Sequence, residues 1–112
     1  MPPRETPTLP PHWFQILLAL ADHDLHGLGV MNEVLERTGG HMRLWPGMLY
    51  RNLQRLADEH LIAETSGAPS PGAGNPRYYR ITPAGRRACA AEARRLAEFV
   101  AVARDKRLLR KT

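Results

Sequence analysis

The sequence contains a single cysteine and no long apolar run. Cys89 alone allows no internal disulfide, and its alanine neighbours predict a small buried side chain rather than a reactive thiol. No apolar run approaches the about 18 residues that a membrane span needs, so no membrane partner is expected. The first residues, MPPRETPTLPP, lack the apolar core of a secretory signal. These absences predict a soluble, cytoplasmic protein.

Acidic residues are outnumbered by basic ones, and the formal net charge of the 112 residues is +5. The excess lies at the C-terminal end, where Arg86 to Thr112 hold nine Lys or Arg against three Asp or Glu. Such a charge favours an acidic partner: nucleic acid, an anionic surface or an acidic protein. The length allows one compact core but not two independent domains.

Residues that could carry metal or covalent chemistry are few. The stretch DHDLH, residues 22–26, has two carboxylates and two imidazoles, but its spacing matches no zinc pattern, so a polar turn is favoured. Ser66 and Ser70 lie in a segment rich in Gly and Pro, where nothing would hold a general base beside them. GAPSPGAG lacks the Lys-Ser or Lys-Thr pair of a phosphate loop. We therefore expect no enzyme, no metal site and no cofactor.

Apolar periodicity and turn residues predict a mostly α protein with a small β-hairpin. Helices are expected at 11–21, 27–38, 46–60 and 83–107, and strands at 61–65 and 77–81. In the second helix, Leu28, Met31, Val34 and Leu35 should face the core, and Gly39 and Gly40 should end it. This order of elements is that of a winged helix-turn-helix.

The chain therefore divides into four parts. Residues 1–10, with four prolines, and residues 109–112 are expected to be disordered. Residues 11–82 form the expected winged-helix DNA-binding domain. Residues 83–108 form a long C-terminal dimerisation helix, which Thr82 should cap.

The stretch LWPGMLYRNLQRL, residues 44–56, separates polar from apolar side chains on a helix. Three leucines share one face, and the opposite face carries Tyr50, Arg51, Gln54 and Arg55. In a helix-turn-helix the second helix enters the major groove, where Arg can pair with guanine and Gln with adenine. A merely solvated polar face is the alternative, and an aromatic side chain among basic ones argues against it.

The expected hairpin adds two more cations. Arg77 and Arg80 flank a long glycine-rich turn, as expected for a wing that follows the DNA backbone or enters the minor groove. The alternative is that both are ordinary charges at a strand edge.

Four blocks of this sequence resemble the PadR family of bacterial transcriptional regulators: LHGLGVMNEV, LWPGMLYRNLQRLADEHLIAE, RYYRITPAG and the Ala- and Arg-rich helix that follows. The resemblance covers residues 12–105. It implies a winged-helix repressor that dimerises through its C-terminal helix, binds a palindromic operator and is often released by a small-molecule effector. Three positions depart from the family pattern, namely Trp45, Met48 and Arg51, so the operator sequence cannot be carried over.

From the helix face, the hairpin and the resemblance together, we predict eight residues that contact double-stranded DNA. They are Pro46, Met48, Tyr50, Arg51, Gln54, Arg55, Arg77 and Arg80.

The last helix carries an apolar stripe whose spacing alternates four and three, as in a coiled coil. The predicted homodimer interface consists of Trp13, Cys89, Ala93, Leu96, Phe99, Val100 and Ala103. The alternative is that the stripe packs on the first helix of the same chain. An effector could bind in the cleft between these two helices, near Trp13 and Phe14. A winged helix that docks an acidic protein partner is the alternative function.

Overall fold

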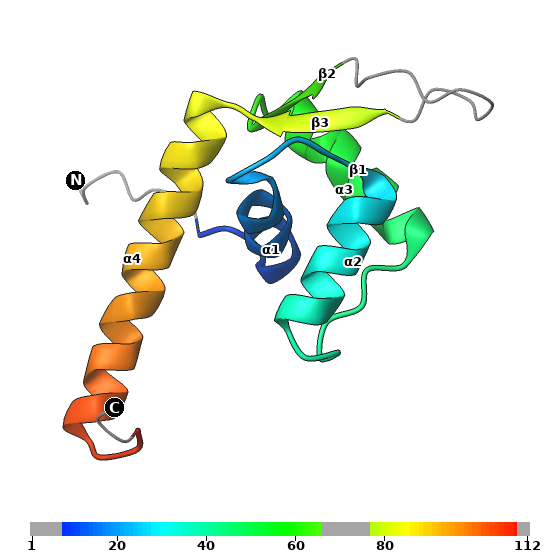
Figure 1. The fold of residues 1–112 in the computed structure, drawn as a ribbon. Coiled ribbons are helices and arrows are strands. Elements are labelled where there is room, and N and C mark those ends of the chain that lie inside the picture. Colours follow the sequence, from blue (N-terminus) through cyan, green and yellow to red (C-terminus); the bar gives the residue numbers. More distant parts are fainter. Residues whose placement is uncertain (1–7, 66–76, 110–112) are drawn as a thin grey trace.

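The computed structural model describes residues 8–65 and 77–109, and it confirms the winged helix-turn-helix with a long last helix (Figure 1). Its helices and strands are α1 (Pro11–Leu20), β1 (Leu25–His26), α2 (Gly27–Arg37), α3 (Pro46–Asp58), β2 (Ile62–Thr65), β3 (Tyr78–Ile81) and α4 (Pro83–Asp105). The wing tip expected at 66–76 lies outside the described residues, as do residues 1–7 of the arm expected at 1–10 and residues 110–112 of the tail expected at 109–112.

Local signals explain where the helices begin and end. Gly39 and Gly40 follow α2 with φ of +62° and +85°, a region that glycine adopts readily. The Thr82 hydroxyl accepts a hydrogen bond from the Gly85 N–H at 3.0 Å and caps α4. The same hydroxyl donates to the His60 carbonyl at 2.7 Å, which ties the start of α4 to the turn after α3.

The core lies between the first three helices and one face of the sheet. Its largest fully buried side chains are Ile16, Leu17, Leu20, Val30, Val34, Leu44, Leu49, Leu53, Leu56 and Ile62. Tyr79 and Ile81 reach it from β3, while Tyr78 and Arg80 lie on the other face of the strand, as period-2 alternation predicts.

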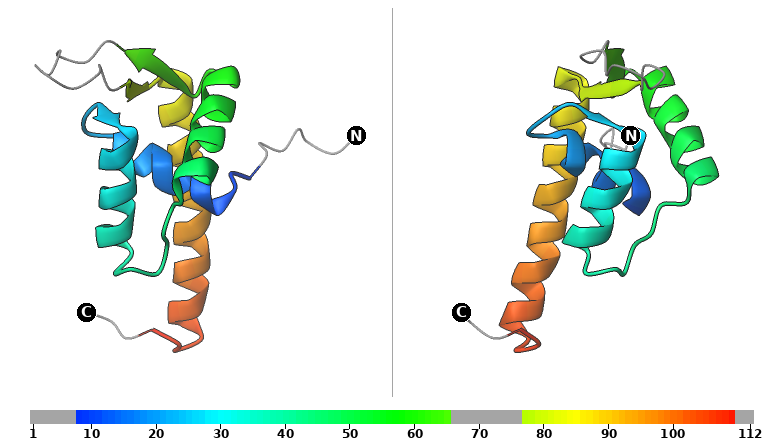
Figure 2. Two further views of the ribbon diagram at one scale, coloured as in Figure 1. Left: turned by 90° about the vertical axis from the view of Figure 1, so that its right-hand side faces the viewer. Right: turned by 45° about the vertical axis from the view of Figure 1, so that its right-hand side comes forward.

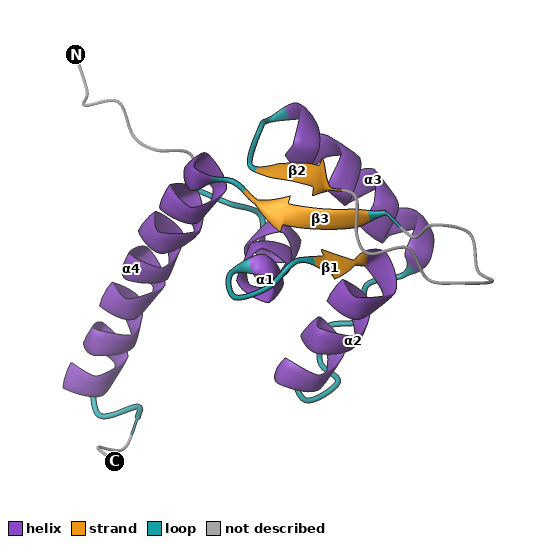
Figure 3. Ribbon diagram, turned by 45° about the horizontal axis from the view of Figure 1, so that its top comes forward, coloured by secondary structure: helices purple, strands orange, loops and turns teal. Residues whose placement is uncertain are grey.

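Strand β1 was not predicted from the sequence. β1 pairs antiparallel with β3, Leu25 opposite Tyr79 and His26 opposite Tyr78, so β3 is the centre of a three-stranded sheet (Figure 3). A two-residue strand is too short for an alternating pattern, and only its pairing partner defines it.

The inward face of α2 also differs from the prediction. Leu28 is 57% exposed, and the buried positions are Gly27, Val30 and Val34. The expectation for Leu28 was therefore wrong. The helix is rotated so that its glycine, rather than its first leucine, faces α3.

α4 leaves the core and projects beyond the rest of the molecule (Figure 2). Its first half is held by the core, where Gly85, Cys89 and Glu92 are buried. From Ala93 onward almost every side chain is exposed, including several large apolar ones.

Candidate nucleic-acid interface

α3 separates its side chains as the sequence predicts. Leu49, Leu53 and Leu56 are fully buried. On the outer side, the recognition face (Tyr50, Arg51, Gln54 and Arg55) is exposed. Pro46 begins the helix, and Met48 is partly buried against the core. The α3 helix therefore presents one aromatic, one amide and two guanidinium groups to the outside.

The two arginines of the recognition face differ from those of the wing. Within the described residues, neither Arg51 nor Arg55 is paired with a carboxylate. Arg77 pairs with Glu64 at 3.2 Å, and Arg80 donates to both oxygens of Asp24, the shortest contact being 2.9 Å. The Asp24 hydrogen bonds raise the pKa of Arg80. The α3 cations are free to bind an anion, whereas the wing cations must first exchange a carboxylate.

Gln54 also has a partner, because its side-chain N–H donates to Asp58 Oδ1 at 3.0 Å, one turn further along α3. This exposed bond is weak and easily exchanged. Trp45, which stands before Pro46, supplies no side-chain cap, and the Arg43 guanidinium lies 5.2 Å from the centre of its ring.

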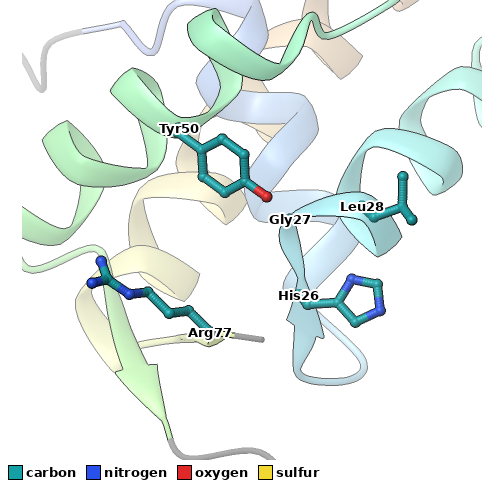
Figure 4. A pocket seen from close by; sticks show the side chains of 5 residues that line it. All are labelled: His26, Gly27, Leu28, Tyr50 and Arg77. Atoms are coloured by element: carbon teal, nitrogen blue, oxygen red, sulfur yellow. The ribbon is translucent and has the colours of Figure 1, made fainter. Parts of the chain in front are cut away.

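A cavity of about 440 Å³ lies between α2, α3 and the wing (Figure 4). It is lined by His26, Gly27, Leu28, Tyr50 and Arg77. Tyr50 extends from α3 toward Gly27, whereas the Arg77 side chain extends from the start of β3 with its guanidinium directed away from His26 and Leu28. His26 caps α2 by accepting the Gly29 N–H at Nδ1, 3.0 Å away, so its neutral imidazole carries the proton on Nε2.

Sequence reasoning missed one side chain that supports this surface. Asn52 of α3 accepts a hydrogen bond from the Trp13 indole N–H at 2.9 Å and donates to the Met48 carbonyl. Trp13, predicted at a dimer interface, thus contacts α3 of its own chain. Only the alternation of polar residues on α3 could have drawn attention to Asn52, and it gives no partner.

The α4 residues predicted at the dimer interface differ in their exposure. Cys89 is buried in the core of its own chain, so it is not available to a partner, and that part of the prediction needs correction. Burial raises the pKa of its thiol, which disfavours the reactive thiolate. Leu96, Phe99 and Val100 are exposed, as is Ala93, while Ala103 is partly exposed.

A second cavity, of about 460 Å³, lies between residues 8–11, α1 and α4. Phe14, Leu96 and Leu9 contribute apolar walls, and Glu92 and Arg95 contribute charges. Glu92 is buried, accepts two hydrogen bonds from Arg95 and receives the Leu9 N–H at 3.4 Å. The pKa of Glu92 is lowered, chiefly by the Arg95 hydrogen bonds.

The four candidate metal residues at positions 22–26 have different partners in the structure. Asp24 pairs with Arg80 and His26 caps α2. Asp22 and His23 lie near Glu33, with ligand atoms within 4.8 Å of one another. Arg37, however, pairs with Glu33 at 2.5 Å, and its positive charge disfavours a cation at this exposed cluster.

No helix in the part of the chain that the structure describes is long and apolar enough to cross a membrane.

Residues 16–91 match the transcriptional regulator PadR-like family. Because this match covers more than half of a chain with a winged-helix fold, the protein belongs to the PadR-like family of transcriptional regulators. An uncharacterized 37.1 kDa protein in transposon TN4556 of Streptomyces fradiae is 40% identical to it over 84 residues. That similarity covers 75% of this chain and 22% of the relative, so the chain spans about a fifth of the relative's length.

Two solved structures share the fold. A PadR family transcription regulator from Clostridium difficile R20291 has a TM-score of 0.73 and 21% identity, covering 84% of this chain and 95% of that chain. Bacillus subtilis PadR in complex with operator DNA has a TM-score of 0.63 and 20% identity, covering 70% of this chain and 44% of that chain.

Proposed function

We propose that this PadR-like regulator is a homodimeric repressor that binds a palindromic DNA operator and is released by a small-molecule effector. The observation that best supports a DNA contact is the separation of apolar and polar side chains on α3. Its three leucines are fully buried, while the recognition face holds two arginines that have no carboxylate partner within the described residues.

The chemistry of the recognition face suits the edge of a duplex. Guanidinium and amide groups can form paired hydrogen bonds with guanine and adenine, and the same groups can hold phosphate. The Bacillus subtilis PadR structure, whose fold this chain shares, was solved with operator DNA. Arg77 and Arg80 of the wing would join the contact by exchanging Glu64 and Asp24 for phosphate oxygens.

Dimerisation is supported by the far half of α4. Phe99 is 58% exposed, and Leu96 and Val100 lie beside it at helical spacing. A helix that projects from a small core leaves such a stripe in water unless a partner covers it. A two-fold dimer would present two α3 helices to half-sites about one helical turn apart.

The effector proposal rests on the cavity between α1 and α4. It lies beside the exposed stripe and combines the apolar Phe14 and Leu96 with the Glu92–Arg95 pair. A ligand bound there would contact both helices and could change how two subunits place their α3 helices.

Fluorescence anisotropy with DNA from upstream of the protein's own gene tests this function, with a scrambled duplex as control and two salt concentrations. We expect preferential binding to the upstream duplex that weakens steeply with salt. Equal binding to both duplexes would contradict sequence-specific regulation. Absence of binding at low salt would favour the alternative, a winged helix that docks an acidic protein. A promoter–reporter assay then separates repression from activation.

A further inference from the structure

Gly27 is buried at the first position of α2, and the ring of Tyr50 lies directly against it (Figure 4). A Cβ atom at position 27 would lie 2.7 Å from Tyr50 Oη and 2.9 Å from Cε1 and Cζ. Non-bonded contacts of real Cβ atoms are essentially never this short. A side chain at position 27 would therefore displace the end of the Tyr50 ring.

The helix itself does not require glycine at this position. Gly27 has no positive φ, and alanine is generally favoured over glycine in helices by up to about 1 kcal/mol. Nor does the core require Tyr50 to lie where it does, because this side chain is 51% exposed while the leucines of α3 fill the core. The glycine thus serves the placement of an exposed ring.

The contact directs Tyr50 toward α2. The ring forms one wall of the cavity that also contains His26, Leu28 and Arg77, between the first helix of the helix-turn-helix pair and the wing. Within the described residues the Tyr50 hydroxyl forms no hydrogen bond, so it can donate to a ligand. Arg77 and His26 also line this cavity, so two further polar residues lie around it.

The position of the cavity indicates which part of a duplex it would meet. In helix-turn-helix proteins the first helix crosses the sugar–phosphate backbone, while the second reads base edges. We propose that Gly27 is a positioning residue that holds Tyr50 for a contact with the DNA backbone rather than with a base. The inference rests on the proposed DNA-binding function and assigns Tyr50 a different role from Arg51 and Gln54.

Gly27→Ala tests the inference, with Gly29→Ala as the matched control. Both add one methyl group to α2, but at position 29 the nearest atom is the Leu25 side-chain methyl at 3.3 Å, and Tyr50 is not among the nearest atoms. We expect both variants to melt no lower than the wild type. Only Gly27→Ala should weaken binding, by about two- to tenfold for the loss of one hydrogen bond, and equally for the upstream and scrambled duplexes.

Two further measurements isolate the route through Tyr50. Combined with Tyr50→Ala, Gly27→Ala should cause no additional loss of affinity. The dependence of affinity on salt should not change, because a neutral hydroxyl releases no counterion.

Each alternative result contradicts a different statement. Wild-type affinity in folded Gly27→Ala would overturn the positioning role and leave the DNA-binding function standing. A loss confined to the upstream duplex would overturn the backbone contact. A wild-type protein that binds neither duplex would overturn the inference together with the proposed function. If Gly27→Ala does not fold, Tyr50→Phe decides, since it removes only the hydroxyl: unchanged affinity for both duplexes would contradict the proposal.

Discussion

The arginines of the proposed interface differ in whether an ion pair must break before they can bind DNA. Arg51 and Arg55 have no carboxylate partner in the described part of the chain, whereas Arg80 holds Asp24 through both carboxylate oxygens. An exposed ion pair contributes little to stability, but it competes with phosphate for the same guanidinium. We therefore expect the α3 arginines to contribute more to DNA affinity than the wing arginines.

Arg51→Ala should weaken operator binding by about five- to 150-fold, the range for loss of a bidentate base contact of about 1–3 kcal/mol. It should also relax the preference at one base pair. Competition binding against duplexes with single base-pair changes measures both effects. Arg94→Ala, which removes the same charge from an exposed position of α4, should change affinity little and preference not at all. A uniform loss across all duplexes would assign Arg51 to phosphate instead.

A second glycine has a structural role. A Cβ at Gly85 would lie 2.0 Å from the Leu61 carbonyl oxygen, which also accepts the Thr82 N–H. Unlike the end of an exposed ring, this backbone atom cannot move alone. Gly85→Ala should therefore lower the free energy of unfolding by about 1–3 kcal/mol or more, measured by urea denaturation. Gly47→Ala, where nothing lies within 4 Å of the new atom, is the control and should retain wild-type stability.

At the scale of residues, the sequence predicted the features that follow from helical periodicity. It did not predict contacts between side chains that lie far apart along the chain. The polar and apolar sides of α3 follow from helical spacing, and the structure shows both. The contacts of Tyr50 with Gly27 and of Asn52 with Trp13 join positions that lie more than 20 residues apart. No periodicity indicates such pairs, so the cavity beside the recognition face could not be predicted.

At the scale of elements, caps and breakers were reliable guides. The predicted bounds of the long helices agree with the structure to within about two residues, because Pro46, Gly39 and Thr82 act locally. By contrast, β1 exists only through its pairing with β3, and the rotation of α2 depends on its packing against α3. Local signals indicate neither. α4 combines both cases, since its start is set by a cap and its burial ends where the core ends.

The N-terminal segment before α1 is fastened to α4 by a buried carboxylate. Arg95 lowers the pKa of Glu92 in the folded protein, so this group contributes stability above its ordinary pKa of about 4.3. That contribution should be lost as the pH falls through the lower, folded-state pKa. The wild type should melt higher than Glu92→Gln at pH 7, and this difference should shrink as the pH falls below about 4.3 and through the folded-state pKa.

Thermal melts followed by circular dichroism between pH 3 and 7 give this comparison. Glu98→Gln is the control, because Glu98 is exposed on the same helix. Its melting temperature should follow that of the wild type at every pH. A Glu92→Gln variant that melts parallel to the wild type over the whole range would show that the buried pair is not coupled to folding.

At the scale of the whole molecule, α4 extends beyond the small core, and its two halves have different environments. The first half of α4 belongs to the monomer, since Cys89 and Glu92 are buried there. The second half carries the exposed stripe, and four basic residues follow the helix, namely Lys106, Arg107, Arg110 and Lys111. Repulsion between the basic ends of two copies opposes dimerisation, and burial of the apolar stripe favours it.

Val100→Glu tests which effect dominates. A carboxylate in the middle of the stripe would have to be buried unpaired in a dimer, which is strongly unfavourable. We expect this variant to sediment as a monomer that keeps the wild-type helix content. Ala101→Glu adds the same charge at the next, exposed position, off the stripe, and should remain dimeric.

Loss of the dimer should affect DNA binding more than it affects folding. A dimer contacts two half-sites with one loss of translational freedom, so the monomer should bind a palindromic operator no more tightly than a single half-site. Anisotropy titrations of Val100→Glu against full and half operators should therefore give the same affinity, whereas the wild type prefers the full site. A monomeric variant that still prefers the full palindrome would mean that contacts between the DNA-binding domains, rather than α4, join the two copies on DNA.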